Sequence, residues 1–240
     1  MVRSHRSVDS AITDKTKDLF RHVRENFLKV RPQIIGLGSG KTVADIVSHI
    51  GKLPDKESLR FIVSSLQIKQ EAEVNKLNVI DENEAMNIQI LLDGADQLDS
   101  QYHMIKGGGG ALFREKILFA ASRSIVILAD SSKYVKQLNR AVPIEVHPFA
   151  RSLFGTRIHD LNTKVTDCNL RLSHKGFPIF TENGNVIFDV SFESLSSLSE
   201  TYNELKNIPG VIEVGIFPRP KKVSYYKIHQ DNSFEVFNFK

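Results

Sequence analysis

The chain has 240 residues, of which 41% are hydrophobic and 25% charged, as in an ordinary globular protein. This length is enough for one large domain, alone or with a small one. The sequence shows neither a run of about eighteen apolar residues nor an apolar leader, so we expect no membrane span and no secretion. A single cysteine, Cys168, favours the cytoplasm, and a net charge of +4 without a basic block argues against nucleic acid as a partner.

Alternating strands and helices are predicted over the first part of the chain. Apolar residues at helical spacing predict a helix over residues 14–30, which Arg31-Pro32 ends. Strands are then expected at residues 33–37, 59–64, 77–80, 88–92 and 124–129, and helices at 43–50, 67–76 and 114–121. This alternation predicts an α/β fold with a Rossmann-like, mostly parallel sheet that helices cover on both faces.

The pattern changes after about residue 140. Strands are expected at residues 143–149, 163–172, 185–190 and 211–217, and helices at 151–161 and 195–206, with a turn at Glu182-Asn183-Gly184. This β-α-β-β-α-β order is the split ferredoxin-like plait. We therefore predict a small ferredoxin-like α+β domain of residues 141–217. The Rossmann-like domain would comprise residues 1–140 and 218–240, because the basic and aromatic tail is expected to return to it.

A glycine-rich turn separates the first predicted strand from the helix that follows it. It reads Gly36-Leu37-Gly38-Ser39-Gly40-Lys41-Thr42. Glycines let backbone N–H groups approach an anion closely, and the start of a helix adds the positive end of its dipole. We therefore expect Ser39, Gly40, Lys41 and Thr42 to bind a phosphate, with a turn that binds nothing as the alternative.

Two nucleotide-binding motifs are incomplete in this turn. A Walker A loop requires glycine five positions before Gly40, where the chain has Ile35. A dinucleotide fingerprint requires glycine at the position of Lys41. The sequence therefore argues against ATP and NAD, and the scattered histidines show no metal-ligand spacing. We expect a site without a metal or an organic cofactor.

Acidic residues and a lysine–glycine run form a second polar group. Asp93-Gly94-Ala95-Asp96 follows a predicted strand, and ligands of open parallel sheets bind outside the carboxyl ends of the strands. Taken alone, this segment is equally typical of a solvated turn. Lys106 precedes four consecutive glycines, residues 107–110, and Glu115 lies on the helix after them. Ordering four glycines costs chain entropy, which favours a loop close to a ligand over a flexible linker.

These segments together resemble the type A ribose-5-phosphate isomerase family, over nearly the whole chain. The family's phosphate loop is matched by IGLGSGKTVADIV, its DGADE loop by LLDGADQLD and its lysine–glycine–glutamate segment by MIKGGGGALFREKI. Further family blocks are matched by ILADSSKYV and TENGNVIFDV. The resemblance implies an aldose–ketose isomerase of the non-oxidative pentose phosphate pathway, which interconverts D-ribose 5-phosphate and D-ribulose 5-phosphate through an enediolate. It also implies a homodimer or homotetramer.

The resemblance also implies roles for individual residues. Glu115 would be the general base that moves the carbon-bound proton, and Lys106 would stabilise the enediolate oxygen. Asp93 would assist ring opening and proton transfer between oxygens, while Asp96 would bind sugar hydroxyls and orient Lys106. Further substrate contacts are expected from Gly107, Gly108, Gly109 and Lys133. A solvated loop lysine is the alternative for Lys133.

Two positions depart from the family pattern. Lys41 stands where the family usually has a small hydroxyl residue, and it would either strengthen phosphate binding or alter the loop. Gln97 stands where the family usually has glutamate, and we expect it to contact the sugar ring or the residues around it. The alternatives are a different enzyme on a similar core, such as a glucosamine-6-phosphate deaminase or a CoA transferase, and a non-catalytic sugar-phosphate sensor. The lysine–glycine run and the small domain argue against the other enzymes, and the complete set of polar site residues argues against the sensor.

Overall fold

The structure of the chain is a computed structural model that describes residues 17–28 and 33–239. The predicted helix at residues 14–30 is present as α1 (Lys17–Phe27), and the ends of that prediction lie outside the described residues. No helix of the described residues is long and apolar enough to cross a membrane. Short 3-10 turns occur at Lys56–Ser58, Glu82–Asn87, Ser131–Lys133, Pro148–Ala150 and Ile158–Asp160.

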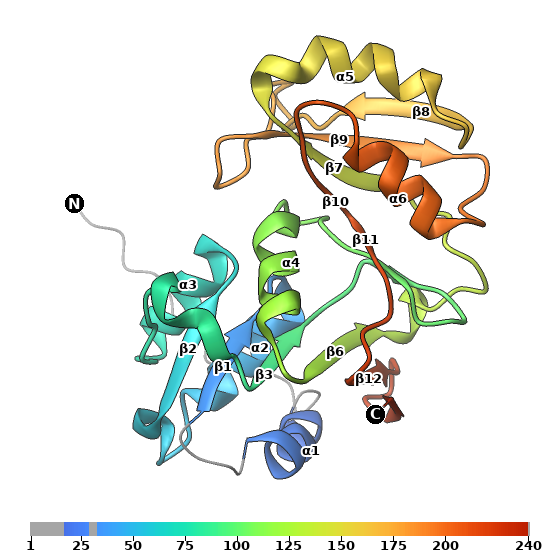
Figure 1. Cartoon of the computed structure of the whole chain (residues 1–240). Coiled ribbons are helices and arrows are strands. Elements are labelled where there is room, and N and C mark those ends of the chain that lie inside the picture. The colour runs from blue at the N-terminus through green and yellow to red at the C-terminus, as the bar shows by residue number, and fades with distance from the viewer. Residues whose placement is uncertain (1–16, 29–32, 240) are drawn as a thin grey trace.

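A six-stranded sheet forms the larger part of the molecule (Figure 1). Its order is β13-β12-β6-β3-β1-β2. The parallel strands are β1 (Gln33–Leu37), β2 (Leu59–Val63), β3 (Ile90–Asp93), β6 (Ile125–Asp130) and β12 (Val223–Ile228). Only β13 (Phe234–Phe239), at one edge, runs antiparallel. The predicted mostly parallel sheet is therefore confirmed.

The central strands are buried on both faces because successive apolar side chains point to opposite sides. In β6, Val126 and Leu128 pack with α1, α2 (Lys41–Ile50) and α3 (Leu66–Val74) in one core cluster. Their neighbours Ile125 and Ile127 pack in a second cluster that contains Leu118 of α4 (Leu112–Ala121). Helix α4 therefore covers the face of the sheet that the other three helices leave open.

A second, four-stranded sheet carries its own core. It comprises β7 (Val142–Val146), β8 (Val165–Leu170), β9 (Val186–Phe192) and β10 (Val211–Val214) in the order β10-β7-β9-β8. Every pairing in it is antiparallel. Two helices, α5 (Arg151–Arg157) and α6 (Leu198–Lys206), complete a β-α-β-β-α-β order, which confirms the ferredoxin-like plait. This small domain lies beyond α4 from the large sheet (Figure 1).

A small three-stranded sheet joins the two parts, and the sequence pattern does not reveal it. It comprises β4 (Gln97–Leu98), β5 (Met104–Ile105) and β11 (Ile216–Phe217) in the order β11-β5-β4. The predicted strand at residues 211–217 is thus two strands, β10 and β11, which are separated at Gly215. The N–H of Gly215 donates to Pro143 and its carbonyl accepts from the N–H of Lys106. A Cβ at Gly215 would lie 2.3 Å from the Lys106 carbonyl oxygen, so this crossing requires glycine.

Other elements differ from the prediction in detail. The strand predicted at residues 77–80 is wrong, because only a single bridge between Phe61 and Val79 forms there. The tail returns to the large sheet as predicted, and it does so as the hairpin β12–β13, with β12 paired to β6. We propose that the division into residues 141–217 and the rest of the chain describes two domains, although β11 pairs with β5 across that division.

Candidate active site

The candidate site lies at the carboxyl ends of β1 and β3. These neighbours form a switch point, since β1 pairs on its other side with β2 and β3 with β6. The loops after the two strands, residues 38–40 and 94–96, border a cavity of about 110 Å³. The residues that line it are Ser39, Gly40, Lys41, Thr42, Gln67, Gly94, Ala95, Asp96, Lys106, Gly107, Gly108, Gly109, Glu115 and Lys133. The structure therefore brings all the predicted site residues except Asp93 to one cavity wall.

Lys106 is the centre of the site. Its ammonium lies 2.9 Å from Oδ2 of Asp93 and 3.2 Å from Oε2 of Glu115, and it donates to the carbonyl of Gly94 at 2.7 Å. The side chain is 3% exposed. Two carboxylates and a carbonyl therefore hold one buried cation in a fixed position. Lys106 reaches this position because β5 ends one residue before it and pairs with β11.

Asp93 lies behind Lys106 and is fully buried. Its Oδ1 accepts from the backbone N–H of Gly94 at 2.7 Å and of Ser39 at 3.4 Å. Burial raises the pKa of Asp93 to about 7, because the charged form is penalised there and the Glu115 charge adds to this, although Lys106 opposes it. The expected direct role of Asp93 in ring opening requires contact with substrate, whereas this carboxylate does not line the cavity.

The charge of Lys106 is maintained by its carboxylate neighbours. Burial alone would lower the pKa of this lysine, because it penalises the ammonium. Asp93 and Glu115 together outweigh burial and hold the pKa of Lys106 above its ordinary value. Lys106 is therefore a permanent cation across the neutral range.

Glu115 is positioned by the first turn of α4 and is 2% exposed. Its Oε1 accepts a hydrogen bond from the hydroxyl of Ser39 at 2.5 Å. Within the described part of the chain, Oε2 has no hydrogen-bond partner apart from its ion-pair neighbour Lys106. One carboxylate oxygen is thus fixed, and the other lies beside a cation on the cavity wall. Such an arrangement suits a general base.

Asp96 organises the glycine loop rather than Lys106. Its Oδ2 accepts from the backbone N–H of Gly108 at 2.7 Å. Gly107 and Gly110 have φ angles of +106° and +84°, which side chains with a Cβ rarely adopt. The predicted orientation of Lys106 comes from Asp93, Glu115 and Gly94 instead.

Two lysines were predicted to contact substrate, Lys41 at the phosphate and Lys133 elsewhere in the site, and they lie differently. Lys41 is the first residue of α2, but its ammonium pairs with Asp45 at 2.9 Å and its side chain is 87% exposed. The long side chain therefore follows the helix toward solvent. Lys133 lies on the cavity wall, where its ammonium donates to the carbonyl of Ala95 at 2.6 Å. The alternative of a solvated loop lysine is thus wrong for Lys133, whose pKa is lowered chiefly by burial.

The Gln97 side chain lies away from the cavity. Its Nε2 donates to Oδ1 of Asn139 at 2.7 Å, and its Oε1 accepts from the backbone N–H groups of Asn139 and Arg140. Gln97 thus fixes the segment that leads to β7, and the expectation that it contacts the sugar ring is wrong for this geometry. Gln67 was missed, although it lines the cavity from the first turn of α3. Gln67 follows the carboxyl end of β2 closely, and ligands of parallel sheets bind at that end, so its position after a predicted strand was the available signal.

A larger cavity, of about 1060 Å³, lies elsewhere and lacks this chemistry. It is lined by other residues of α4, such as Lys116 and Phe119, and by Tyr202 and Pro218. None of the residues that surround Lys106 with charge lines it. Among residues 17–28 and 33–239, no three His, Cys, Asp or Glu side chains gather as a metal site would require. The acid–base cluster therefore marks the smaller cavity as the candidate active site.

Together, the two-domain α/β fold and the buried cluster define a class of protein that performs acid–base chemistry at the switch point of a parallel sheet. Residues 60–230 match the family model of ribose 5-phosphate isomerase A (phosphoriboisomerase A). The chain is 41% identical over 189 residues to ribose-5-phosphate isomerase A of Korarchaeum cryptofilum, covering 77% of this chain and 81% of that protein. The chain therefore belongs to the ribose 5-phosphate isomerase A family.

Solved structures are similar over almost the whole chain. Ribose 5-phosphate isomerase from Plasmodium falciparum superposes with a TM-score of 0.85 at 27% identity, covering 94% of this chain and 98% of that one. A D-ribose-5-phosphate isomerase in complex with phospho-erythronic acid gives a TM-score of 0.82 at 28% identity, covering 93% and 97%. The similarity thus includes the large sheet, with the candidate site at its strand ends, and the small sheet.

Proposed function

We propose that this chain interconverts D-ribose 5-phosphate and D-ribulose 5-phosphate through an enediolate. The observation that carries the proposal is the Lys106 ammonium held 3.2 Å from Oε2 of Glu115 on the cavity wall. An aldose–ketose isomerase needs a base for a carbon-bound proton and a cation for the oxygen that becomes negative. Family membership, stated above, supports the choice of substrate.

The proton transfers follow from this pair. Glu115 removes the proton from C2 of the open-chain aldose, and the electrons of that bond form the C1–C2 double bond while O1 becomes negative. Lys106 stabilises the negative oxygen, because its ammonium is already buried and held in place before the reaction. Glu115 then returns its proton to C1, and the proton of the C2 hydroxyl passes to O1. The sum is an isomerisation with no atom gained or lost.

The other carboxylates support this pair from different places. Asp96 lines the cavity and is the candidate for contacts with the sugar hydroxyls. Asp93 is separated from the cavity by Lys106, so we propose that it acts by orienting that cation. The roles of Gly107, Gly108, Gly109 and Lys133 as substrate contacts remain proposals, supported by their place on the cavity wall.

The substrate phosphate would bind at the start of α2. Gly40 precedes this ten-residue helix, and no side chain caps it by a hydrogen bond, so the first N–H groups of the helix are left for a ligand. Backbone N–H groups and the helix dipole favour a phosphate there. Thr42 would add its hydroxyl, and Lys41 would contribute its backbone N–H rather than its ammonium.

The test is the formation of ribulose 5-phosphate from ribose 5-phosphate by purified protein, with chelator present, for wild type and Glu115→Gln. Loss of a general base reduces rate by about 10²–10⁴-fold. We expect chelator-resistant turnover that collapses in Glu115→Gln but persists in Glu25→Gln, which changes an exposed glutamate of α1. A folded wild-type protein without turnover would refute the function, and an active Glu115→Gln variant would refute Glu115 as the base.

We further propose that phospho-erythronic acid, which a solved relative binds, inhibits this chain competitively against ribose 5-phosphate. It carries a phosphate and a carboxylate, so it places negative charge where the enediolate oxygen would meet Lys106. Competitive inhibition of the wild type, together with direct binding that weakens in Lys106→Met, would support this pose. Direct binding of the same strength in Lys106→Met would contradict it.

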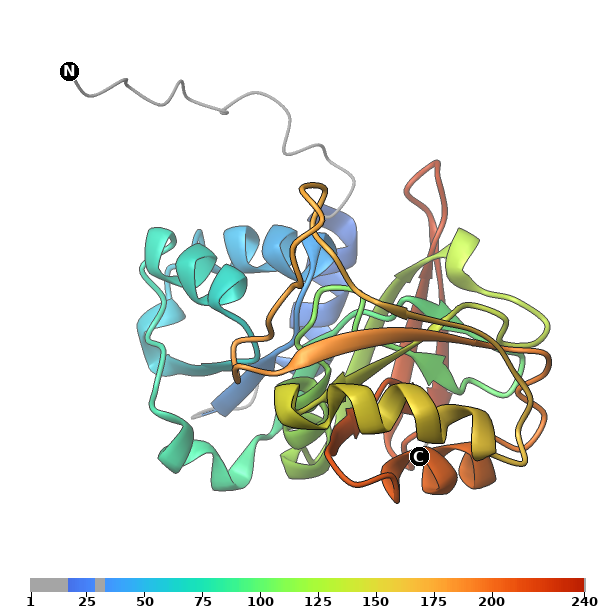
Figure 2. The ribbon, with the colours of Figure 1, turned by 90° about the horizontal axis from the view of Figure 1, so that it is seen from above.

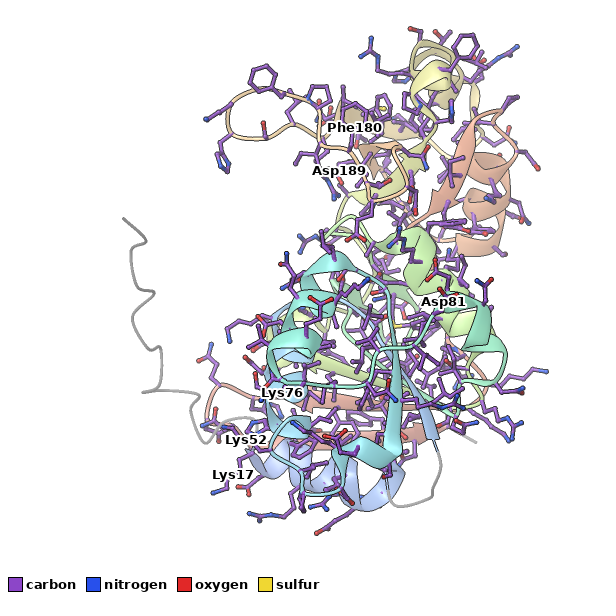
Figure 3. All side chains as sticks on the ribbon, turned by 90° about the vertical axis from the view of Figure 1, so that its left-hand side faces the viewer. Lys17, Lys52, Lys76, Asp81, Phe180 and Asp189 are labelled. Atoms are coloured by element: carbon purple, nitrogen blue, oxygen red, sulfur yellow. The ribbon has the colours of Figure 1, made fainter. Side chains whose placement is uncertain are left out.

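We propose that the chain forms a homodimer or homotetramer through its small domain. This domain carries exposed aromatic side chains, including Phe149 at 95%, Phe177 at 68% and Phe180 at 60% exposure. Figure 2 shows the connection between β8 and β9 projecting from this domain, and Figure 3 labels Phe180 within it. A second copy of the chain would bury this apolar surface. Sedimentation of wild type and of Phe177→Ser/Phe180→Ser tests this, since a monomeric wild type would contradict it.

We keep the cytoplasm as the proposed compartment. The single Cys168 lies half-buried on β8, where burial raises the pKa of its thiol to about 11. A single cysteine cannot form a disulfide within the chain, and disulfides are the feature that marks proteins of oxidising compartments. Cell fractionation would test the location.

A further inference from the structure

One side chain of the small domain crosses to the glycine loop of the site. Arg171 follows β8, and its Nη1 donates to the carbonyls of Gly107 at 2.9 Å and Gly108 at 3.1 Å. Neither the resemblance nor the local sequence pattern pointed to this residue, because 64 positions separate it from Gly107.

The guanidinium of Arg171 is itself fixed within the small domain. Its Nε donates to Oδ2 of Asp189 at 2.7 Å, and its Nη2 pairs with Oδ1 of the same carboxylate. Asp189 belongs to β9, and Figure 3 labels it on the small domain. The Arg171 side chain is 15% exposed. A planar fork that pairs with a carboxylate on one edge can therefore present its remaining N–H groups in one direction only.

The glycine loop makes hydrogen bonds to two different residues, Asp96 and Arg171. On the cavity side, Gly108 donates its N–H to Asp96, and a Cβ at Gly109 would lie 3.6 Å from Oγ of Ser39. On the other side, the carbonyls of Gly107 and Gly108 accept from Arg171. Arg171 thus holds the two carbonyls from the small domain, while Asp96, a residue of the cavity wall, holds the N–H of Gly108.

Consecutive glycines give this loop more conformational freedom than any other sequence would. Because its residues have no side chains, the loop is ordered by its own backbone hydrogen bond and by contacts from residues outside it. The described contacts that fix its backbone are the turn from Gly107 to Gly110, the Asp96 acceptor and the Arg171 donors. Of these, only Arg171 comes from the small domain.

We propose that Arg171, oriented by Asp189, is a positioning residue of the isomerase. It holds the glycine loop in the conformation that binds the sugar, so the small domain takes part in substrate binding as well as in assembly. The proposal rests on the proposed isomerase function and adds to it a residue outside the catalytic cluster.

The experiment is steady-state kinetics on ribose 5-phosphate with Arg171→Ala, Arg171→Lys and, as a matched control, Lys164→Ala. Lys164 precedes β8 and pairs with the exposed Glu193, so it tests loss of an ion pair on the same sheet without contact to the loop. Hydrogen bonds from a charged donor are strong enough that we expect KM to rise about tenfold or more in Arg171→Ala. We expect a smaller change in kcat, and a smaller rise of KM in Arg171→Lys, because lysine lacks the fork.

Added guanidinium ion separates positioning from mere stability. It is the group that Arg171→Ala removes and can donate to the same two carbonyls, so we expect it to lower the KM of this variant toward the wild-type value. Methylammonium at the same concentration serves as the comparison, because it lacks the planar geometry. Unchanged KM in both Arg171 variants, or a raised KM that guanidinium does not lower, would overturn the proposal.

If Arg171→Ala does not fold, KM is measured for Arg171→Lys and Asp189→Asn instead, after thermal unfolding has shown that both are folded. A raised KM in these variants would support the positioning role, and an unchanged KM would overturn it. A wild-type protein without turnover would contradict the isomerase function, whereas an active wild type with unaffected Arg171 variants would contradict only the positioning role.

Discussion

Gly38 is required because the buried carboxylate of Asp93 occupies the space that a side chain would need. A Cβ at Gly38 would lie 1.8 Å from Oδ1 of Asp93 and 2.0 Å from its Cγ. To reach even 3.0 Å, the closest atoms must separate by 1.2 Å (3.0 − 1.8). That displacement disturbs the 2.9 Å contact between Asp93 and Lys106.

We therefore expect Gly38→Ala to lower the free energy of unfolding by about 2–4 kcal/mol, since overpacking and a disturbed buried ion pair act together. We also expect kcat/KM to fall by roughly 10²-fold, because Lys106 moves relative to Glu115. Urea unfolding and isomerase kinetics measure the two effects. Gly155→Ala is the matched control, because a Cβ there meets nothing within 4 Å. It lies inside α5, so alanine should stabilise the protein slightly.

A double-mutant cycle identifies the cause. In an Asp93→Ala background the space beside residue 38 is free, so the further change Gly38→Ala should cost less than about 1 kcal/mol. Destabilisation by Gly38→Ala of equal size in both backgrounds would refute the proposed collision. Unchanged stability and activity in the single variant would refute the geometry itself.

Three further outcomes are expected. Because the pKa of Asp93 is raised to about 7, the folded state binds more protons than the unfolded one above about pH 4. The free energy of unfolding of wild type, relative to Asp93→Asn, should fall as pH rises from about 4 to 7, and urea titrations showing a rise would contradict this. Lys41→Ser should change kcat/KM less than about threefold, because the exposed ammonium pairs with Asp45. A large rise in KM would show instead that this ammonium binds the substrate phosphate. Gln97→Ala should lower the free energy of unfolding by about 1–2 kcal/mol in thermal unfolding, because its hydrogen bonds to Asn139 are lost. KM should not change, and a raised KM would indicate that Gln97 contacts the substrate.

The fold was predictable where the sequence has a period. The parallel strands appear as short apolar runs, and the small domain follows from the order of its elements. The two-residue strands β4, β5 and β11 are too short to show alternation, so nothing local distinguishes them from loops. The break at Gly215 arises from a close approach to Lys106, which is a tertiary contact.

The chemistry of the site was predictable where residue type alone determines it. Lys106 and Glu115 lie together because one segment carries both, on either side of the glycine loop. The depth of Asp93 was not predictable, since two carboxylates in one turn give no sign of which one faces inward. The direction of Lys41 was missed because the helix was predicted to begin at residue 43, whereas α2 begins at Lys41 and pairs it with Asp45 one turn later.

The small domain is inserted between two strands that lie next to each other in the large sheet. Ile125 of β6 pairs with Val223 of β12, which is 98 positions later (223 − 125). During synthesis, the edge of β6 that pairs with β12 therefore stays unpaired until the small domain has been translated. The small domain can fold before the large sheet is complete. A nascent chain that stops before β12 would present an open apolar strand to its neighbours, a template for aggregation that the C-terminal hairpin β12–β13 removes.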